Sequence, residues 1–81
     1  MSDQPIQTWA VGDVCRISRV LAKDRQARDM LIAKGFIPGE MITIMHRLFR
    51  GKYWVVRIHE QLVALRLAEL QHLQLHVFAI H

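Results

Sequence analysis

Apolar and polar residues alternate with a period of two along several short segments of the chain, as they do in half-buried β-strands. Within the segment 11–21, Cys15 and Ile17 occupy one face, and Val14 and Arg16 occupy the other. This alternation predicts the first strand of a sheet.

The next segment has the spacing of a helix instead. Asp24 offers a side-chain oxygen as an N-cap, and Ala27, Met30 and Leu31 recur at intervals of three and four residues before Gly35. Glycine is the usual residue just beyond the end of a helix. The pattern predicts one helix of about three turns directly after the first strand.

The segment 36–39 predicts a reversal of the chain after this helix. Pro38 fixes its own φ, and Gly39 permits a positive φ that other residues resist. The pair is typical of a type II turn.

The segments 41–49 and 53–59 predict a β-hairpin. In the first segment the alternation places Ile42 and Ile44 on one face and Arg47 on the other. In the second segment the side chains assigned to the core are Trp54, Val56 and Ile58.

The remaining chain predicts two more strands. Glu60 and Gln61 are expected to form a turn, 62–66 a short strand and 67–70 one helical turn. The segment 73–80 is the expected last strand, and its core-facing residues are Leu73, Leu75 and Val77.

Five short strands with one substantial helix define a mainly β chain. Because 81 residues provide no second layer to cover an open sheet, the strands can hide their apolar faces only by curling into a small barrel. We expect 1–8 to be a flexible N-terminal segment and 9–81 to be a single domain. The one α-helix then follows the first strand, and the short helical turn precedes the last strand.

Composition restricts where the chain works. Its apolar runs are much shorter than the roughly 20 residues of a membrane-spanning helix, and the N-terminus lacks the pattern of a secretory signal. The lone Cys15 has no partner for an intramolecular disulfide, which fits a reducing compartment. We therefore expect a cytoplasmic protein.

The sequence offers little chemistry for catalysis. Cys15 lies in a predicted strand beside Val14, Arg16 and Ile17, which favours a core or half-buried thiol, and the scattered glycines form no phosphate-binding loop. The five histidines have no diagnostic metal-ligand spacing; His72 and His76, with Gln74 between them, are expected to form a solvent-facing row. We predict no enzyme activity, no cofactor and no structural metal site.

The end of the predicted hairpin is the best candidate for a partner-binding surface. The net charge is +4, and basic residues are densest here, beside two aromatic residues. The candidate residues are Arg47, Phe49, Arg50, Lys52 and Tyr53. They could contact a protein partner, stack on the bases of a nucleic acid, or form only a solvated turn.

The order of several short motifs resembles the FeoA family. The chain has Val11-Gly12-Asp13, then after the helix Lys34-Gly35-Phe36-Ile37-Pro38-Gly39, and near the end Ala64-Leu65-Arg66 followed by Leu67-Ala68-Glu69. The resemblance covers roughly 9–78. It departs from the family in the hairpin, where Arg47-Leu48-Phe49-Arg50-Gly51-Lys52 replaces an Arg-Ala-Pro-like segment and a Gly-Asp-Pro turn, and at Glu60-Gln61, where Gly is common.

The resemblance implies a five-stranded SH3-like barrel without catalytic activity. It implies a partner, a membrane ferrous iron transporter with a GTP-hydrolysing domain, which would hold this protein at the membrane periphery and be modulated by it. A weak iron contact, or one shared with that partner, stays open. So do two alternatives, a nucleic-acid-binding barrel, which we consider the weaker, and a free-standing relative of the SH3-like domain of metal-dependent repressors. An unpaired barrel edge also offers a route to homo-oligomers.

Overall fold

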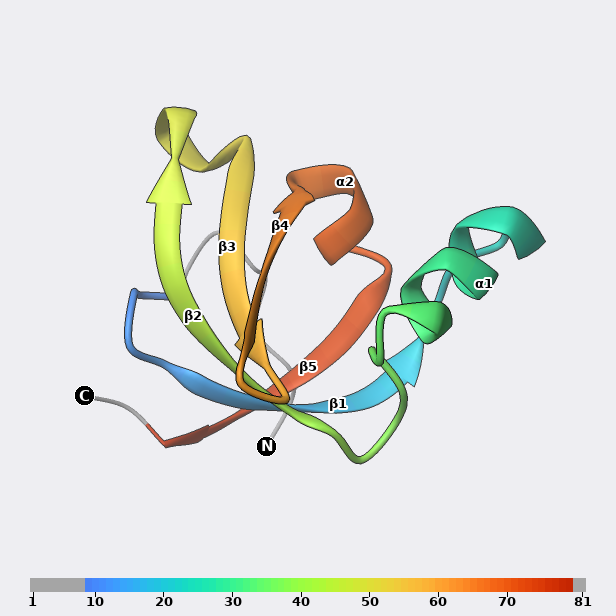
Figure 1. Cartoon of the computed structure of the whole chain (residues 1–81), viewed down its shortest axis with the longest axis horizontal. Coiled ribbons are helices and arrows are strands. Elements are labelled where there is room, and N and C mark those ends of the chain that lie inside the picture. Colours follow the sequence, from blue (N-terminus) through green and yellow to red (C-terminus); the bar gives the residue numbers. More distant parts are fainter. Residues whose placement is uncertain (1–8, 80–81) are drawn as a thin grey trace.

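In a computed structural model, the described residues are 9–79, and they form five strands and three short helical segments (Figure 1). The expected flexible segment 1–8 and the end of the chain, 80–81, lie outside this range. The elements in order are β1 (Val14–Val20), α1 (Arg25–Ala33), β2 (Met41–Leu48), the 3₁₀ helix η2 (Phe49–Gly51), β3 (Tyr53–Ile58), β4 (Gln61–Arg66), α2 (Leu67–Leu70) and β5 (Leu73–Ala79).

The strands form one antiparallel sheet in the order β4-β3-β2-β1-β5. The sheet is strongly curved, so that the strands wrap around a single interior (Figure 1). The predicted mainly β class, the five strands, the helix after β1 and the helical turn before β5 are therefore confirmed. β4 and β5 are the end strands of the sheet.

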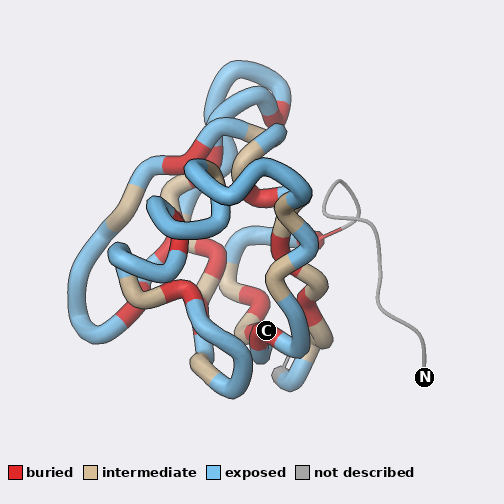
Figure 2. The backbone as a smooth tube through the Cα atoms, turned by 90° about the vertical axis from the view of Figure 1, so that its right-hand side faces the viewer, coloured by how far each residue is buried: buried red, intermediate tan, exposed pale blue. Residues whose placement is uncertain are grey.

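The core is built from the inward side chains of every strand, together with side chains from the connections between them. Buried stretches recur in short pieces all along the backbone, as expected when alternate strand residues face the interior (Figure 2). The buried apolar residues are Trp9, Cys15, Ile17, Leu31, Phe36, Ile42, Ile44, Trp54, Val56, Ile58, Leu65, Leu70, Leu73 and Leu75. The predicted core positions of β3 are thus confirmed, and in β5 Val77 is only partly buried.

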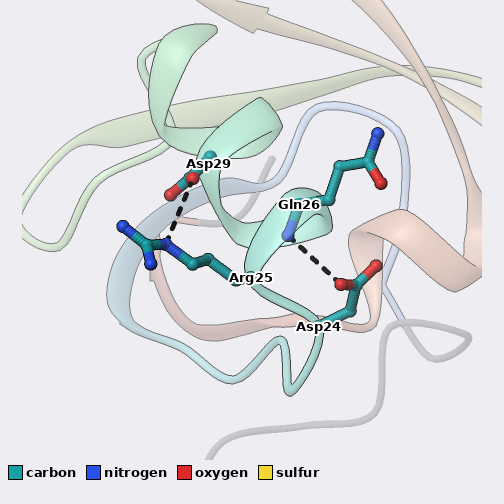
Figure 3. A network of polar contacts seen from close by, with 4 residues as sticks. All are labelled: Asp24, Arg25, Gln26 and Asp29. Atoms are coloured by element: carbon teal, nitrogen blue, oxygen red, sulfur yellow. Dashed lines mark hydrogen bonds and ion pairs between the residues drawn. The ribbon is translucent and has the colours of Figure 1, made fainter.

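Helix α1 begins where the sequence predicts. The Asp24 carboxylate accepts a hydrogen bond from the backbone N–H of Gln26 at 3.2 Å, and Arg25 and Asp29 form an exposed ion pair at 3.8 Å (Figure 3). Leu31 is its one buried residue, and the helix projects away from the strands (Figure 1). No helix among the described residues is long and apolar enough to cross a membrane.

The chain reversal expected at 36–39 is present. The N–H of Glu40 donates to the carbonyl oxygen of Ile37 at 3.1 Å, and Gly39 between them has φ of 95°. This combination is the type II turn that the sequence predicts.

The face assigned to Arg47 is wrong. An irregularity in the pairing between Ile44 and His46 inserts Met45 as an extra residue in β2. The insertion shifts the alternation, so Arg47 pairs with inward-facing Trp54 and not with the outer residues of β3.

The turn between β3 and β4 also differs from the prediction by one residue. Its centre is His59 and Glu60, with φ of 50° and 64°, and Gln61 already pairs with Ile58 as the first residue of β4. Two consecutive residues with positive φ are the signature of a type I′ turn, which matches the twist of the flanking strands.

Candidate partner-binding site

The end of the β2–β3 hairpin has an unusual backbone. Phe49, Arg50 and Gly51 follow one another with φ of 51°, 58° and 88°, all in the left-handed region. Each non-glycine residue in that region is disfavoured by roughly 1–2 kcal/mol. Interactions elsewhere in the hairpin must therefore stabilise this conformation.

Buried packing beneath the hairpin end supplies that stabilisation. The indole Nε1 of fully buried Trp54 donates to the carbonyl oxygen of Gly51 at 2.8 Å. The guanidinium of Arg47 lies 5.9 Å from the centre of the Trp54 ring, within range of a cation–π contact. A Cβ atom on Gly51 would lie 3.1 Å from Nε of Arg47, so a larger residue would have to displace the Arg47 side chain by a few tenths of an ångström, and φ of 88° also favours glycine here.

Two further backbone hydrogen bonds hold the hairpin end, one within it and one to the rest of the barrel. The N–H of Lys52 donates to the carbonyl oxygen of Phe49 at 3.1 Å, and the carbonyl oxygen of Lys52 accepts from the N–H of Leu67 at 2.8 Å. Leu67 begins α2, so the hairpin end is attached to the segment that connects β4 to β5. The backbone of residues 49–52, held by Trp54 and by these hydrogen bonds, is called the frame of the candidate site below.

The frame presents two aromatic rings to solvent. Phe49 is 71% exposed and Tyr53 is 40% exposed, and their rings meet edge to face with centroids 5.6 Å apart. Edge-to-face contact is a favourable arrangement for aromatic rings, so each ring helps to hold the other. The side chains of Arg50 and Lys52 are exposed beside them.

All five predicted partner-binding residues are exposed at this end of the hairpin: Arg47, Phe49, Arg50, Lys52 and Tyr53. Arg47 is brought to the same end of the hairpin, but its guanidinium lies over Trp54. Through this contact with Trp54, Arg47 helps to stabilise the frame.

Two exposed leucines extend this surface, and the sequence analysis did not identify them. Leu48 pairs with Tyr53, and Leu62 of β4 pairs with Arg57 on the same outer side of the sheet. Leu62 is 61% exposed. The available signal was the alternation of β4, which puts Val63 and Leu65 toward the interior and Leu62 outside.

Cys15 is not suited to nucleophilic chemistry. Burial, with a smaller contribution from the negative charge of Asp13, raises the pKa of the thiol to about 12. The thiol is therefore neutral at pH 7, and the reactive thiolate is absent. This agrees with the interpretation of Cys15 as a core residue.

The histidines are dispersed in the fold. His72 precedes β5, while Gln74 and His76 are half-buried within it, and His81 lies outside the described residues. Nε2 of His59 lies 2.9 Å from a carboxylate oxygen of Glu40, which connects the β3–β4 turn to the loop after α1. In the part of the chain that the structure describes, no three His, Cys, Asp or Glu side chains are grouped to hold a metal ion.

The sequence of this chain matches the model of a known protein family. The model of the FeoA domain matches residues 5–76, nearly the whole sequence. The chain belongs to the FeoA family. No curated protein is significantly similar to it in sequence.

Solved structures show the same fold as this FeoA-family protein. Iron(II) transport protein A from Clostridium thermocellum is 26% identical, with a TM-score of 0.80 over 91% of this chain and 45% of that one. FeoA from Stenotrophomonas maltophilia, solved in complex with zinc and described as a prokaryotic SH3 domain protein, is 17% identical, with a TM-score of 0.75 over 90% and 89%.

The fold also occurs as part of a longer protein. IdeR from T. acidophilum is 19% identical, with a TM-score of 0.82 over 96% of this chain and 35% of that one. At this identity the similarity shows the fold alone. The FeoA family and the SH3-like barrel, both expected from the motifs, are confirmed.

Proposed function

We propose that this FeoA-family protein is a non-enzymatic accessory of ferrous iron transport that works in the cytoplasm. It binds the cytoplasmic part of a membrane ferrous iron transporter and modulates that transporter's GTP-hydrolysing domain. Membership of the family supports the connection to ferrous iron transport, and FeoA of Stenotrophomonas maltophilia has been suggested to activate such transport.

The exposed aromatic pair Phe49–Tyr53 is the observation that carries this proposal. Aromatic and arginine side chains contribute most of the binding energy in many protein interfaces, particularly when they are held rigidly before binding. The pair stands on a frame fixed by Trp54 and Gly51, with Arg50 and Lys52 beside it. The same side chains are not needed to fill the core, so binding is a sufficient reason for their exposure.

Capture of the transporter in detergent by the tagged protein tests the proposal. The test variant replaces Phe49, Arg50, Lys52 and Tyr53 by alanine and keeps Arg47, because Arg47 packs on Trp54. The control variant carries Arg25→Ala and Asp29→Ala on the exposed face of α1. We expect capture by the wild type and the control and a loss of at least about tenfold in the test variant, since each lost anchor weakens binding by 1 kcal/mol or more.

Failure of the wild-type protein to capture the transporter would contradict the proposal. The second candidate, nucleic-acid binding, is favoured by the basic and aromatic character of the same hairpin end. It predicts binding to oligonucleotides whose affinity falls steeply with added salt. Measuring both ligands with the same four-residue variant separates the two functions.

A further inference from the structure

The free edge of β4 and the outer face of the sheet beside it combine three features: backbone groups without a partner within 9–79, exposed apolar side chains and an excess of basic residues. Sheet edges bind extended peptides through such backbone groups and through the side chains beside them. β4 is the last strand of the sheet at its end, and within 9–79 only β3 pairs with it. Its free edge adjoins the hairpin surface described above, because β3 carries Tyr53 and pairs along its whole length with β4.

The β3–β4 turn determines which backbone groups of β4 point toward β3 and which point away from the sheet. Ile58 and Gln61 flank a two-residue turn, so they form a hydrogen-bonded pair, and every second residue of β4 from Gln61 points its backbone groups toward β3. The N–H and C=O groups of Leu62 and Ala64 therefore point away from the sheet. Arg66 supports this phase, because its N–H also points away from β3 and donates to the Glu69 carboxylate at 2.9 Å.

The charge distribution selects the chemistry of the partner. The segment 46–66 contains five basic residues and one acidic residue, whereas the rest of the sequence contains six of each. The net charge of +4 therefore arises entirely from the hairpin and β4. On the outer side of β3 and β4, exposed Arg57 pairs with Leu62 and exposed Arg66 pairs with Tyr53.

We propose that the free edge of β4 binds an extended acidic peptide segment of a partner protein, which adds to the sheet as a further strand. The unpaired N–H and C=O groups of Leu62 and Ala64 supply its backbone hydrogen bonds. Arg57 and Arg66 bind its carboxylates, and Leu62 with Tyr53 contacts its apolar residues. This inference rests on the proposed function and specifies the kind of segment that the transporter, as the partner, must present.

A peptide fits this surface better than a nucleic acid does. A nucleic acid can use the basic charge and the aromatic rings, but it leaves the edge N–H and C=O groups of Leu62 and Ala64 unused. Exposed Leu48 and Leu62 provide aliphatic surface that apolar side chains cover when they lie on the same face of the added strand as its carboxylates. The test below therefore includes a nucleic acid as an alternative ligand.

The first test uses the full chain and a synthetic ten-residue peptide in which every second residue is Thr and the residues between them are alternately Glu and Val, so that Glu and Val lie on one face of a strand (the Glu–Val peptide). The same peptide with Lys in place of Glu (the Lys–Val peptide) and oligothymidylate are the other probes. Amide hydrogen exchange is measured residue by residue with and without each probe. We expect the Glu–Val peptide to slow exchange at Leu62 and Ala64 by at least about tenfold, as a new interstrand hydrogen bond does. The Lys–Val peptide should slow neither amide.

Variants separate the backbone contribution from that of charge. Ala64→Pro removes an outward N–H without removing a hydrogen bond to β3, and the control Ala64→Val keeps that N–H in a residue suited to strands. The double variant Arg57→Glu and Arg66→Glu leaves the backbone intact. We expect Ala64→Pro and the charge-reversed protein each to bind the peptide about tenfold more weakly, and Ala64→Val to bind as the wild type does.

Exchange at Leu62 and Ala64 that is unchanged by the Glu–Val peptide, or slowed equally by oligothymidylate, would overturn the strand-addition proposal. So would unchanged binding in the charge-reversed protein, a result that does not depend on whether Ala64→Pro folds. Transporter capture distinguishes the two proposals. If the wild type and both edge variants capture the transporter, strand addition is refuted and the accessory function is preserved. If the wild type captures no transporter while the Glu–Val peptide protects the amides of Leu62 and Ala64, only the accessory function is refuted.

Discussion

The turns at the two ends of strand β3 have similar backbone angles but are stabilised by different interactions. At one end Phe49 and Arg50 have positive φ, and at the other end His59 and Glu60 do. Buried Trp54 holds the first turn from inside, whereas the second has a polar contact between His59 and Glu40 whose side chains are 58% and 31% exposed. Similar backbone conformations are thus accompanied by core packing at one turn and by a polar surface contact at the other.

Replacing Trp54 tests the packed end with the largest expected effect. Trp54→Ala removes a large buried side chain and its hydrogen bond to Gly51, and we expect the free energy of unfolding to fall by about 3–5 kcal/mol. A chain of 81 residues has only roughly 4–12 kcal/mol in total, so much of the variant should be unfolded. Urea unfolding followed by circular dichroism measures the loss.

Trp54→Phe is the matched control for that measurement. It keeps an aromatic ring in the core and loses the Nε1 donor, so a smaller decrease of about 1–3 kcal/mol is expected. If Trp54→Ala unfolded at the same urea concentration as the wild type, the tryptophan would not be what supports the hairpin end.

Gly51→Ala should have the next largest effect. The substitution puts a side chain at φ of 88° and 3.1 Å from Nε of Arg47, so we expect a destabilisation of about 1–3 kcal/mol in thermal unfolding. Repeating it in an Arg47→Ala background removes the close contact and leaves the backbone strain. Equal destabilisation in the two backgrounds would show that Arg47 does not restrict this position.

Glu40→Gln tests the turn with the surface contact, where we expect a smaller change. Because both side chains of the His59–Glu40 contact are partly exposed, the loss should be about 0.2–1 kcal/mol. A double-mutant cycle with His59→Gln isolates the coupling between the two residues. A coupling as large as the effect of Trp54→Ala would remove the contrast between the two turns.

Glu60→Gly should produce a similarly small change, in the stabilising direction. Gly relieves the strain at φ of 64°, and part of this gain is offset by the greater freedom of glycine in the unfolded chain. We expect a net gain of about 0.5 kcal/mol in the free energy of unfolding. A loss of stability would mean that the Glu60 side chain makes a contribution that the turn geometry does not reveal.

Most of the fold was predictable because each element carries its own local pattern. The alternation in β3 identified Trp54, Val56 and Ile58 as core residues, and Asp24 marked the start of α1. Arg47 was misplaced because the extra residue in β2 has no local signature: neither Gly nor Pro marks Met45, and the pairing with β3 alone reveals the shift. The β3–β4 turn was misplaced because His59 and Glu60 are not residues that usually adopt positive φ.

The candidate site was predictable in composition and not in geometry. The sequence shows basic and aromatic residues clustered between 47 and 53, and the structure brings Phe49, Arg50, Lys52 and Tyr53 to one surface. The position of the Arg47 guanidinium over Trp54, and the addition of Leu62 from another strand, depend on the register between β2, β3 and β4. Register is a property of paired strands, so no single segment contains it.

The buried thiol in β1 gives the molecule an internal reporter of its own opening. Cys15 is fully buried and pairs with Ile42 of β2 on one side and Val77 of β5 on the other. An alkylating reagent can reach its sulfur only when β1 separates from β2 or from the end strand β5. The rate of thiol labelling under native conditions therefore follows the opening of this side of the barrel, and fraying of the hairpin end leaves it unchanged.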